Sequence, residues 1–272
     1  MKNMQEQVMR VLKATSRTFY LPVVRLPQGL QESVASAYLC MRAIDEIEDH
    51  DELDRILKAK ILRKVSQILQ TQTFVGKKMV KDLEQLFYSH RNTLPEVTLR
   101  LGEWITYSPD TIAPRILDAA ISLAERMAQW VDRNWSIETK ADLDGYTFSV
   151  AGAVGLLMCD IWAWFDGTQI NRISAVRFGR GLQAVNILRN RTSDLKRNVD
   201  FFPAGWEAEN MFTYARSNLE LAKAEIKTMP QKAFEYFVEI PLLLAEATLD
   251  ALERGEEKLS RRQVLAIVQN LQ

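Results

Sequence analysis

Two aspartates four residues apart are the residues of this sequence whose type and spacing could do metal chemistry. Asp45 and Asp49 lie in the stretch Tyr38–Asp49, and in a helix this spacing places both carboxylates on one face. Like charges at this spacing destabilise an isolated helix, and Glu46 and Glu48 add to the repulsion. Two carboxylates held in register suit Mg²⁺, which also takes water and substrate phosphate oxygens as ligands. A solvated acidic helix end has the same spacing, so the pair indicates a metal only together with a partner.

A second polar face is expected on the long helix predicted at residues 171–196. Its polar members are spaced three, four and four residues apart and so share one helix face: Gln183, Asn186, Asn190 and Asp194. If this face were buried, its side chains would be costly without ligands. Neighbouring arginines and lysines leave a solvent-facing polar stripe as the alternative. Two such helices facing each other in an apolar bundle would bind a metal–diphosphate with an apolar tail.

The composition of the chain excludes some classes of function. Its 272 residues contain 35 Lys plus Arg and 35 Asp plus Glu, and this net charge of zero argues against a nucleic-acid-binding protein. Cys40 and Cys159 lack metal-binding spacing and are expected to be buried small hydrophobes. The longest apolar stretch, 150–165, is expected to be too short and too interrupted to span a membrane. We therefore expect a cytoplasmic protein without a transmembrane segment, whose membrane contact is limited to transient surface contact for product release.

Helical periodicity dominates the sequence, and no linker, charge block or low-complexity stretch divides it. We therefore expect an all-α protein with a single domain over residues 1–272. Helices are expected at 6–15, 28–48, 52–69, 77–90, 95–107, 115–131, 140–165, 171–196, 208–228, 231–254 and 260–271, with a break at 16–27. Gly152 and Gly155 lower the helix propensity of the apolar stretch by about 1 kcal/mol each relative to alanine. They indicate a close approach, either by another helix or by a ligand.

Several motifs, in this order, resemble those of the squalene/phytoene synthase family from about residue 16 to about residue 264. They are Ser16–Phe19 with Leu26–Pro27, Tyr38–Asp49, Gly145–Tyr146 with Val150–Gly155, Leu182–Gln183 with Asn186–Arg189, Phe201–Pro203 and, more loosely, Pro241, Ala247–Leu249 and Lys258–Arg262. The resemblance implies a single-domain isoprenoid-synthase helical bundle with a central hydrophobic cavity. Such proteins bind prenyl diphosphates through Mg²⁺. Typical members ionise one farnesyl or geranylgeranyl diphosphate to an allylic cation, which a second molecule attacks.

The resemblance also implies roles for individual residues. The metal ligands would be Asp45, Asp49, Asn186 and Asp194. The catalytic residues would be Asp45, Asp49, Arg42 and Tyr146, with Arg42 on the diphosphate and Tyr146 beside the reacting carbons. The substrate-binding residues would be Ser16, Phe19, Tyr38, Gln183, Asn186, Arg189 and Asn190.

The chain departs from the family pattern in its second motif. Asn190 stands where the family has Asp, and Ser193 replaces the carboxylate that usually precedes the final Asp194. The second face therefore loses up to two negative charges, whereas the first face keeps all of its own. Because hard cations favour carboxylates over amides, Mg²⁺ would be held mainly by Asp45 and Asp49. That ion could still neutralise a leaving diphosphate, but a second prenyl donor would be ordered less well.

This departure favours hydrolysis of farnesyl diphosphate to farnesol, and it makes the chain most similar to the farnesyl-diphosphate-hydrolysing members of the family. Head-to-head condensation of two farnesyl diphosphates to a squalene- or dehydrosqualene-type product is the alternative. It is supported by the residues that the chain retains: Arg42, Tyr146, Gln183, Asn186 and Asp194. NADPH would be required only if squalene is the product. A non-catalytic prenyl-lipid-binding protein is a third alternative, which the retained acidic pair makes the least favoured.

Overall fold

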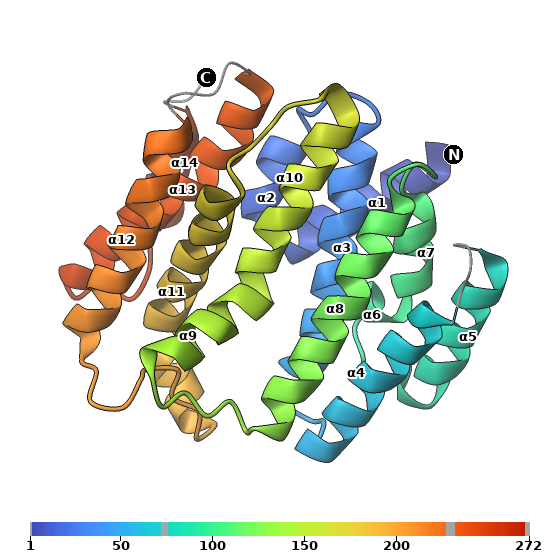
Figure 1. Ribbon diagram of the computed structural model, residues 1–272, viewed down its shortest axis with the longest axis horizontal. Coiled ribbons are helices and arrows are strands. Elements are labelled where there is room, and N and C mark those ends of the chain that lie inside the picture. Colours follow the sequence, from blue (N-terminus) through green and yellow to red (C-terminus); the bar gives the residue numbers. More distant parts are fainter. Residues whose placement is uncertain (1, 72–75, 227–231, 270–272) are drawn as a thin grey trace. The chain divides into compact units, whose positions relative to one another are not determined.

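The computed structural model describes residues 2–71, 76–226 and 232–269, and every regular element among them is a helix. The prediction of an all-α protein is therefore confirmed. Parts of the helices expected at the end of the chain, 227–231 and 270–272, lie outside the described residues. The elements are α1 (Lys2–Thr15), α2 (Arg17–Val23), α3 (Leu30–Glu48), α4 (Arg55–Gln70), α5 (Lys77–Phe87), the 3₁₀ turn η1 (Tyr88–His90), α6 (Glu96–Leu99), α7 (Leu101–Tyr107), α8 (Ala113–Asp132), α9 (Lys140–Thr147), the π-helical segment η2 (Phe148–Gly152), α10 (Ala153–Asp166), α11 (Arg172–Lys196), α12 (Ala208–Ile226), α13 (Lys232–Glu253) and α14 (Arg261–Gln269) (Figure 1).

The helices form two compact units. The first unit comprises residues 1–134 with 160–169, and the second comprises 135–159 with 170–272. Each unit has its own buried apolar residues. The single domain expected over residues 1–272 stays a prediction.

The segment expected as a break after α1 is partly helical. Arg17–Val23 forms α2, and Ser16 caps this helix because its hydroxyl accepts a hydrogen bond from the backbone N–H of Phe19 at 3.1 Å. An N-cap of this kind stabilises a helix start by about 1 kcal/mol. Pro22 indicated a break in the sequence, and it is the next-to-last residue of a helix of only 7 residues.

In the first unit, α3 packs against α1, α4, α6, α7 and α8, and α4 packs along α8 (Figure 1). The apolar residues of α3 recur at helical spacing, and Leu39, Ala43, Ile44 and Ile47 are fully buried. Because these residues take up the packed faces of α3, the remaining face is left partly accessible. That face carries the acidic pair singled out in the sequence.

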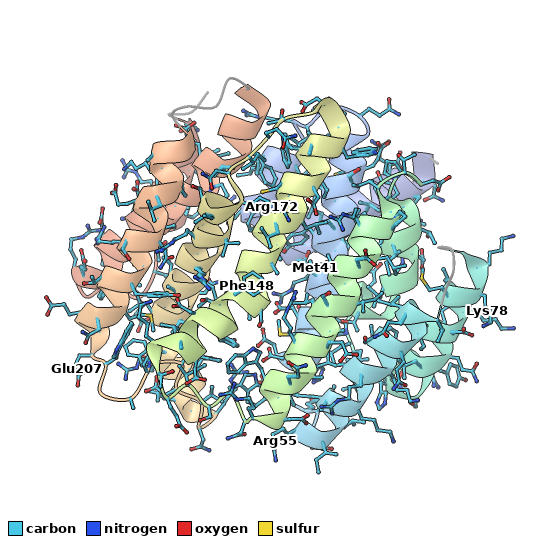
Figure 2. The ribbon with its side chains drawn as sticks, viewed as in Figure 1. Met41, Arg55, Lys78, Phe148, Arg172 and Glu207 are labelled. Carbon is cyan, nitrogen blue, oxygen red and sulfur yellow. The ribbon has the colours of Figure 1, made fainter. Side chains whose placement is uncertain are left out.

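In the second unit, α9, η2 and α10 form one continuous helical stretch, Lys140–Asp166, whose last residues belong to the first unit. The ribbon changes direction at η2, where Figure 2 labels Phe148. A π-helical turn inserts an extra residue into the helix and is often found at functional sites. Here it falls within the Tyr146–Gly155 motif.

Glycines allow this stretch to lie directly against α11. A Cβ atom on Gly155 would stand 2.3 Å from the carbonyl oxygen of Ala175, and one on Gly179 would stand 2.4 Å from that of Ala151. Both distances are far shorter than a real carbon–oxygen contact. Of the two interpretations of the close approach, another helix is therefore the correct one for Gly155.

The same stretch bears on the expected absence of a transmembrane segment. Among the described residues, Lys140–Asp166 is the one helical stretch that is long and apolar enough to cross a membrane by length and composition. The sequence-based expectation counted only the apolar run at 150–165, whereas the helix extends back to Lys140. Core helices of globular proteins can have the same length and composition.

Candidate functional site

The carboxyl end of α3 gathers three carboxylates. One ligand oxygen from each of Asp45, Glu48 and Asp49 lies within 4.8 Å of the other two. Asp49 is the C-cap residue of α3, and its backbone N–H donates to the carbonyl oxygen of Asp45 at 2.9 Å. The carboxyl end of a helix carries partial negative charge, so acidic side chains are unfavourable there. A cation bound between the three side chains would remove both this repulsion and their mutual repulsion.

Glu48 is a member of this group that the sequence analysis did not identify as a ligand. From the sequence, Glu48 was expected only to add to the repulsion between Asp45 and Asp49. In the structure the residue is 4% exposed, and its carboxylate contributes to the cluster. The available signal was its spacing of three residues from Asp45, which also places two side chains on one helix face. Lys58 of α4 reaches the same helix end, where its Nζ donates to the carbonyl oxygen of Glu48 at 2.7 Å.

The electrostatics of the cluster favour a cation. Burial, followed by the negative charge of Asp49, raises the pKa of Asp45 to about 7, and only Arg42 acts strongly in the opposite direction. A divalent ion would reverse this shift by favouring the charged carboxylate. The donor set consists of hard carboxylate oxygens, which suits Mg²⁺ and its preference for oxygen ligands. Asp45, Glu48 and Asp49 are therefore the residues that would hold it.

The partly accessible face of α3 carries a stripe of four residues, which includes two of these acids. Tyr38, Arg42, Asp45 and Asp49 are spaced four, three and four residues apart, so their side chains follow one another along the helix. Arg42 is held between two carboxylates, with Nη1 3.0 Å from Asp45 and Nε 2.9 Å from Glu46. These bonds fix a guanidinium next to the acidic cluster. A substrate diphosphate bound there would meet both a metal and an arginine.

Three further residues predicted to bind substrate lie at the other end of this stripe. The hydroxyl of Tyr38 is hydrogen-bonded to the side chain of Ser16, and its ring centroid lies 5.8 Å from that of Phe19. Burial raises the pKa of Tyr38, so its hydroxyl stays protonated and can donate a hydrogen bond. The structure therefore brings Ser16, Phe19 and Tyr38 together beside Arg42. Their predicted role in binding is compatible with this placement and stays a prediction.

The second polar face lies on α11 in the second unit. Gln183 is partly exposed, and Asn186 and Asn190 are exposed. Arg189 donates from Nε to the side-chain oxygen of Asn190 at 3.3 Å, and Arg189 is itself exposed. These residues have the accessibility expected of a ligand-binding face. The expectation that this face and the α3 face share one cavity stays a prediction.

Asp194 differs from the other members of the α11 face. The residue is 6% exposed, and Arg197 donates to its carboxylate at 2.7 Å. Its backbone carbonyl also accepts from the backbone N–H groups of Arg197 and Val199 at the end of α11. Asp194 is thus largely occupied by the residues that terminate its own helix, and a metal would compete with Arg197 for it. This weakens the second face beyond the loss of charge at Asn190 and Ser193.

Tyr146 is part of the packing of the second unit. It is 4% exposed, and its ring stacks on that of Phe201 with centroids 4.6 Å apart. Its predicted place beside reacting carbons is not tested by this contact and stays a prediction.

A polar network next to Tyr146 was not predicted from the sequence. The hydroxyl of Tyr214 donates to the carboxylate of Asp144 at 2.8 Å and lies 3.0 Å from the hydroxyl of Thr147. Lys140 is bonded to Asp144 at 2.9 Å. The network ties α9 to α12 immediately before the π-helical segment. Tyr214 lies 67 residues after Thr147, so the spacing within α9 cannot point to it.

Comparisons with known proteins agree with the motifs. A family model described as squalene/phytoene synthase matches residues 12–210. The squalene synthase of Schizosaccharomyces pombe is 26% identical over 214 residues, an alignment that covers 71% of this chain and 43% of that protein. The chain therefore spans less than half the length of this curated relative.

Solved structures of similar proteins have the same fold. The complex of TcSQS with the ligand BPH1237 superimposes with a TM-score of 0.78 at 20% identity, covering 99% of this chain and 86% of that chain. A dehydrosqualene synthase in complex with ligand gives a TM-score of 0.67 at 15% identity, with 99% and 95% covered. At these identities the likeness shows the fold, which is the all-α fold of the squalene-type synthases and confirms the expected fold class.

Proposed function

Because the chain belongs to the squalene/phytoene synthase family, we propose that it is an isoprenoid diphosphate enzyme that joins two prenyl diphosphates head to head. The proposed substrate is farnesyl diphosphate, and the product is of squalene or dehydrosqualene type. The sequence had favoured hydrolysis of the same substrate. Relatives named squalene synthase support condensation instead, so condensation becomes the first candidate.

The observation that carries the proposal is the acidic cluster at the end of α3. Asp45, Glu48 and Asp49 would hold Mg²⁺, and Arg42 lies directly beside them. When bound, Mg²⁺ would act as a Lewis acid that neutralises the charge developing on a leaving diphosphate. The protein's own part is to hold three carboxylates in register on one rigid helix and to keep Arg42 oriented by two ion pairs.

The proposed reaction begins with cleavage of the allylic carbon–oxygen bond of the first prenyl diphosphate. Both electrons of that bond leave with the diphosphate, and an allylic cation remains. The double bond of a second prenyl diphosphate attacks this cation, and loss of one proton gives a cyclopropyl intermediate. Exclusion of water from the cation decides the outcome, because water would capture it as an alcohol.

Hydrolysis to farnesol is the second candidate, and a specific observation favours it. Asn190 and Ser193 bring no charge to the α11 face, and Asp194 is already paired with Arg197 at 2.7 Å. A second prenyl diphosphate would therefore be ordered weakly. In that case Mg²⁺-dependent cleavage proceeds at the α3 cluster, but the cation ends as farnesol. Either outcome requires the same carboxylates on α3.

The experiment that separates these candidates follows labelled farnesyl diphosphate in the presence of Mg²⁺, with and without NADPH. The expected result is a C30 product, either a cyclopropyl diphosphate or a hydrocarbon, whose formation needs Mg²⁺. Farnesol as the main product would overturn condensation and support hydrolysis. Tight binding of farnesyl diphosphate that is indifferent to Mg²⁺, without turnover, would instead support a prenyl-lipid-binding protein. Dependence on NADPH would identify squalene as the end product.

The location and partners of the protein remain proposals as well. A cytoplasmic location is proposed from the sequence alone. The balanced charge of 35 basic and 35 acidic residues continues to argue against a nucleic-acid partner. The prenyl diphosphate is the one partner that the α3 cluster and the family together support.

A further inference from the structure

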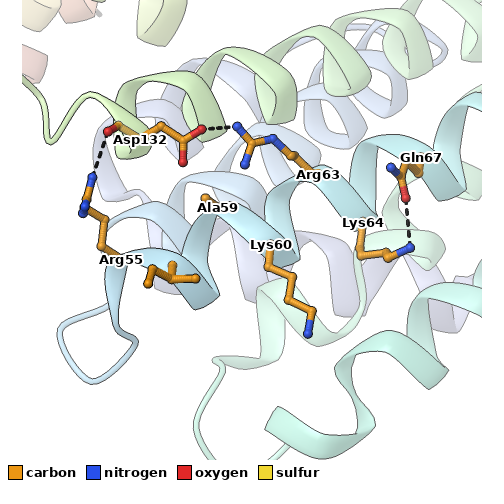
Figure 3. Close-up of a pocket in the computed structure, with 8 residues that line it drawn as sticks. Arg55, Ala59, Lys60, Arg63, Lys64, Gln67 and Asp132 are labelled. Carbon is orange, nitrogen blue, oxygen red and sulfur yellow. Dashed lines mark hydrogen bonds and ion pairs between the residues drawn. The ribbon is translucent and has the colours of Figure 1, made fainter.

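A basic pocket lies on the surface of the first unit, and none of its lining residues belongs to α3. It has a volume of about 450 Å³ and is formed by α4 and the end of α8 (Figure 3). Its lining residues are Arg55, Ile56, Ala59, Lys60, Arg63, Lys64, Gln67 and Asp132. Four of these eight side chains are cationic, and one is anionic. In a chain whose net charge is zero, this is a local concentration of positive charge.

The helix that forms the pocket is itself strongly basic. The sixteen residues of α4 include five cations and no aspartate or glutamate. One of the five, Lys58, points inward and bonds to the end of α3. The other four are exposed and belong to the pocket. The bulk of the basic charge of α4 is therefore directed to solvent on one face.

The two arginines of the pocket are held in fixed positions. Arg55 donates from Nη1 to the backbone carbonyl oxygen of Asp132 at 2.8 Å, and Arg63 is paired with the carboxylate of the same residue. Figure 3 shows both guanidinium groups directed at the end of α8. Asp132 is thus the anchor for two cations but neutralises only one of them. The pocket keeps a surplus of three positive charges.

The lysines provide the charge that a ligand can reach. Lys60 extends away from Asp132 in Figure 3, and Lys64 donates to the neutral side chain of Gln67 at 3.0 Å. Among the ion pairs between described residues, none at 4.0 Å or less involves either lysine. Both ammonium groups are exposed, so they can pair with an anion at little desolvation cost.

This surface also contains one large, exposed apolar residue. Ile56 lies in the pocket lining and is 77% exposed, more than any other large hydrophobic residue described. Singly exposed apolar residues are common on protein surfaces, but here the isoleucine lies among four cations. Such a combination is typical of helices that lie on the surface of an anionic membrane, where cations meet lipid phosphates and an apolar side chain enters the interface.

We propose that the exposed face of α4 docks this protein on an anionic phospholipid membrane, with lipid phosphates in the basic pocket and Ile56 in the interface. The charge complementarity and the exposed apolar residue favour this partner over a free phosphate, because a free phosphate has no apolar part that could contact Ile56. The inference goes beyond the proposed reaction and does not rest on it. It assigns to α4 a peripheral binding role that leaves the acidic end of α3 unaltered.

The test is sedimentation of the full chain with vesicles of neutral phosphatidylcholine, with or without 30% phosphatidylglycerol. The wild-type protein is expected to bind only the anionic vesicles, and less as salt is raised from low to physiological concentration. Lys60→Gln with Lys64→Gln is expected to weaken this binding by about tenfold or more, since each cation near such a surface contributes appreciably. Ile56→Ser is expected to weaken it several-fold without changing the salt dependence.

A matched control removes the same charge elsewhere. Lys258→Gln with Arg261→Gln takes two exposed cations from the second unit, and it is expected to leave vesicle binding within about twofold of wild type. Equal losses in both double variants would overturn the proposal, because they would show a general charge effect. Absence of binding to anionic vesicles would overturn it as well. So would displacement from vesicles by millimolar inorganic phosphate at constant ionic strength, which would identify a site for the free anion.

Discussion

At the scale of single residues, the central feature is a group of carboxylates at the carboxyl end of a helix, where negative charge is unfavourable. Asp45, Glu48 and Asp49 lie at the negative end of the α3 dipole, and their oxygens gather within 4.8 Å. Such an arrangement is costly for folding and is expected where a cation is bound. The neighbouring Glu46 has a different position, since it is bonded to Arg42 rather than directed at the cluster.

This difference predicts distinct effects for the same chemical change at two positions of α3, Glu46 and Glu48. Glu48→Gln removes a charged oxygen ligand and is expected to raise the Mg²⁺ concentration for half-maximal turnover by about tenfold or more. Glu46→Gln is expected to change that concentration by less than about threefold, because Arg42 keeps its bond to Asp45. Magnesium titrations of turnover by the two variants give the comparison. A larger effect at Glu46 than at Glu48 would exclude Glu48 as a ligand.

Asp45 also predicts a pH dependence of stability in the metal-free protein. Its pKa rises from 3.8 to about 7 on folding, so the folded chain binds more protons than the unfolded chain between these values. Stability is therefore lost as pH rises through this window. Asp45→Asn removes the penalty and is expected to raise the melting temperature at pH 8 by about 2 to 5 °C, and by less at pH 5, where the penalty is only partly developed.

Melting curves in excess chelator from pH 5 to pH 8.5 measure this difference. A variant that is less stable than wild type at pH 8, or a gap that does not grow with pH, would contradict the assignment of the strained carboxylate to Asp45. Added Mg²⁺ is expected to stabilise the wild-type protein and to leave Asp45→Asn nearly unchanged, since ligand binding stabilises only the form that binds it.

At the scale of elements, the contact between η2–α10 and α11 depends on glycine. Helix propensity alone would make Gly155→Ala and Gly179→Ala stabilising by about 1 kcal/mol. The structure predicts the opposite sign, because each new Cβ would lie within 2.4 Å of a backbone carbonyl oxygen of the facing helix. Backbone cannot move aside as a flexible side chain can, so a loss of about 2 kcal/mol or more is expected.

Denaturant unfolding of Gly155→Ala and Gly179→Ala measures this loss. Ala141→Gly serves as a control at an exposed position of α9, where only helix propensity is expected to act. If both alanine variants were more stable than wild type, the helices could not be packed as closely as the structure places them.

Some elements could be predicted from the sequence because their physical cause is local. The apolar residues of α3 recur at helical spacing, so its buried face and the opposite face with Tyr38, Arg42, Asp45 and Asp49 follow from periodicity. The polar face of α11 follows in the same way. The motifs around these helices also gave the family and hence the fold.

Other features could not be predicted because their causes lie outside the segment that shows them. The ion pair of Asp194 with Arg197 depends on how α11 ends, and the Asp144–Tyr214 bond joins residues 70 positions apart. The π-helical turn at Phe148–Gly152 has no periodic signal. The basic pocket requires the end of α8 to meet α4, so the sequence of α4 alone shows only a basic amphipathic helix.

At the scale of the whole molecule, the two polar faces belong to different compact units, and they have unequal chemistry. The α3 face keeps its acids, whereas the α11 face has lost charge at Asn190 and Ser193 and has Asp194 paired with Arg197. Bond cleavage would depend on the first face. The ordering of a second substrate would depend more on the second.

This division predicts the effect of restoring the second motif. Asn190→Asp with Ser193→Glu adds two carboxylates and is expected to raise the ratio of C30 product to farnesol several-fold, because the second diphosphate is better held. Product analysis at fixed substrate and Mg²⁺ concentrations measures the ratio. An unchanged ratio would show that the lost carboxylates do not limit coupling. Asn190→Ala with Ser193→Ala controls for substitution without added charge.

The most direct test of the account is the release of diphosphate from farnesyl diphosphate as Mg²⁺ is titrated, compared between wild type and Asp45→Asn. Every proposed outcome of the reaction begins with this cleavage at the end of α3. We expect release that saturates with Mg²⁺ in the wild type and falls by about a hundredfold or more in the variant. Release that does not need Mg²⁺, or that is equal in Asp45→Asn, would contradict it.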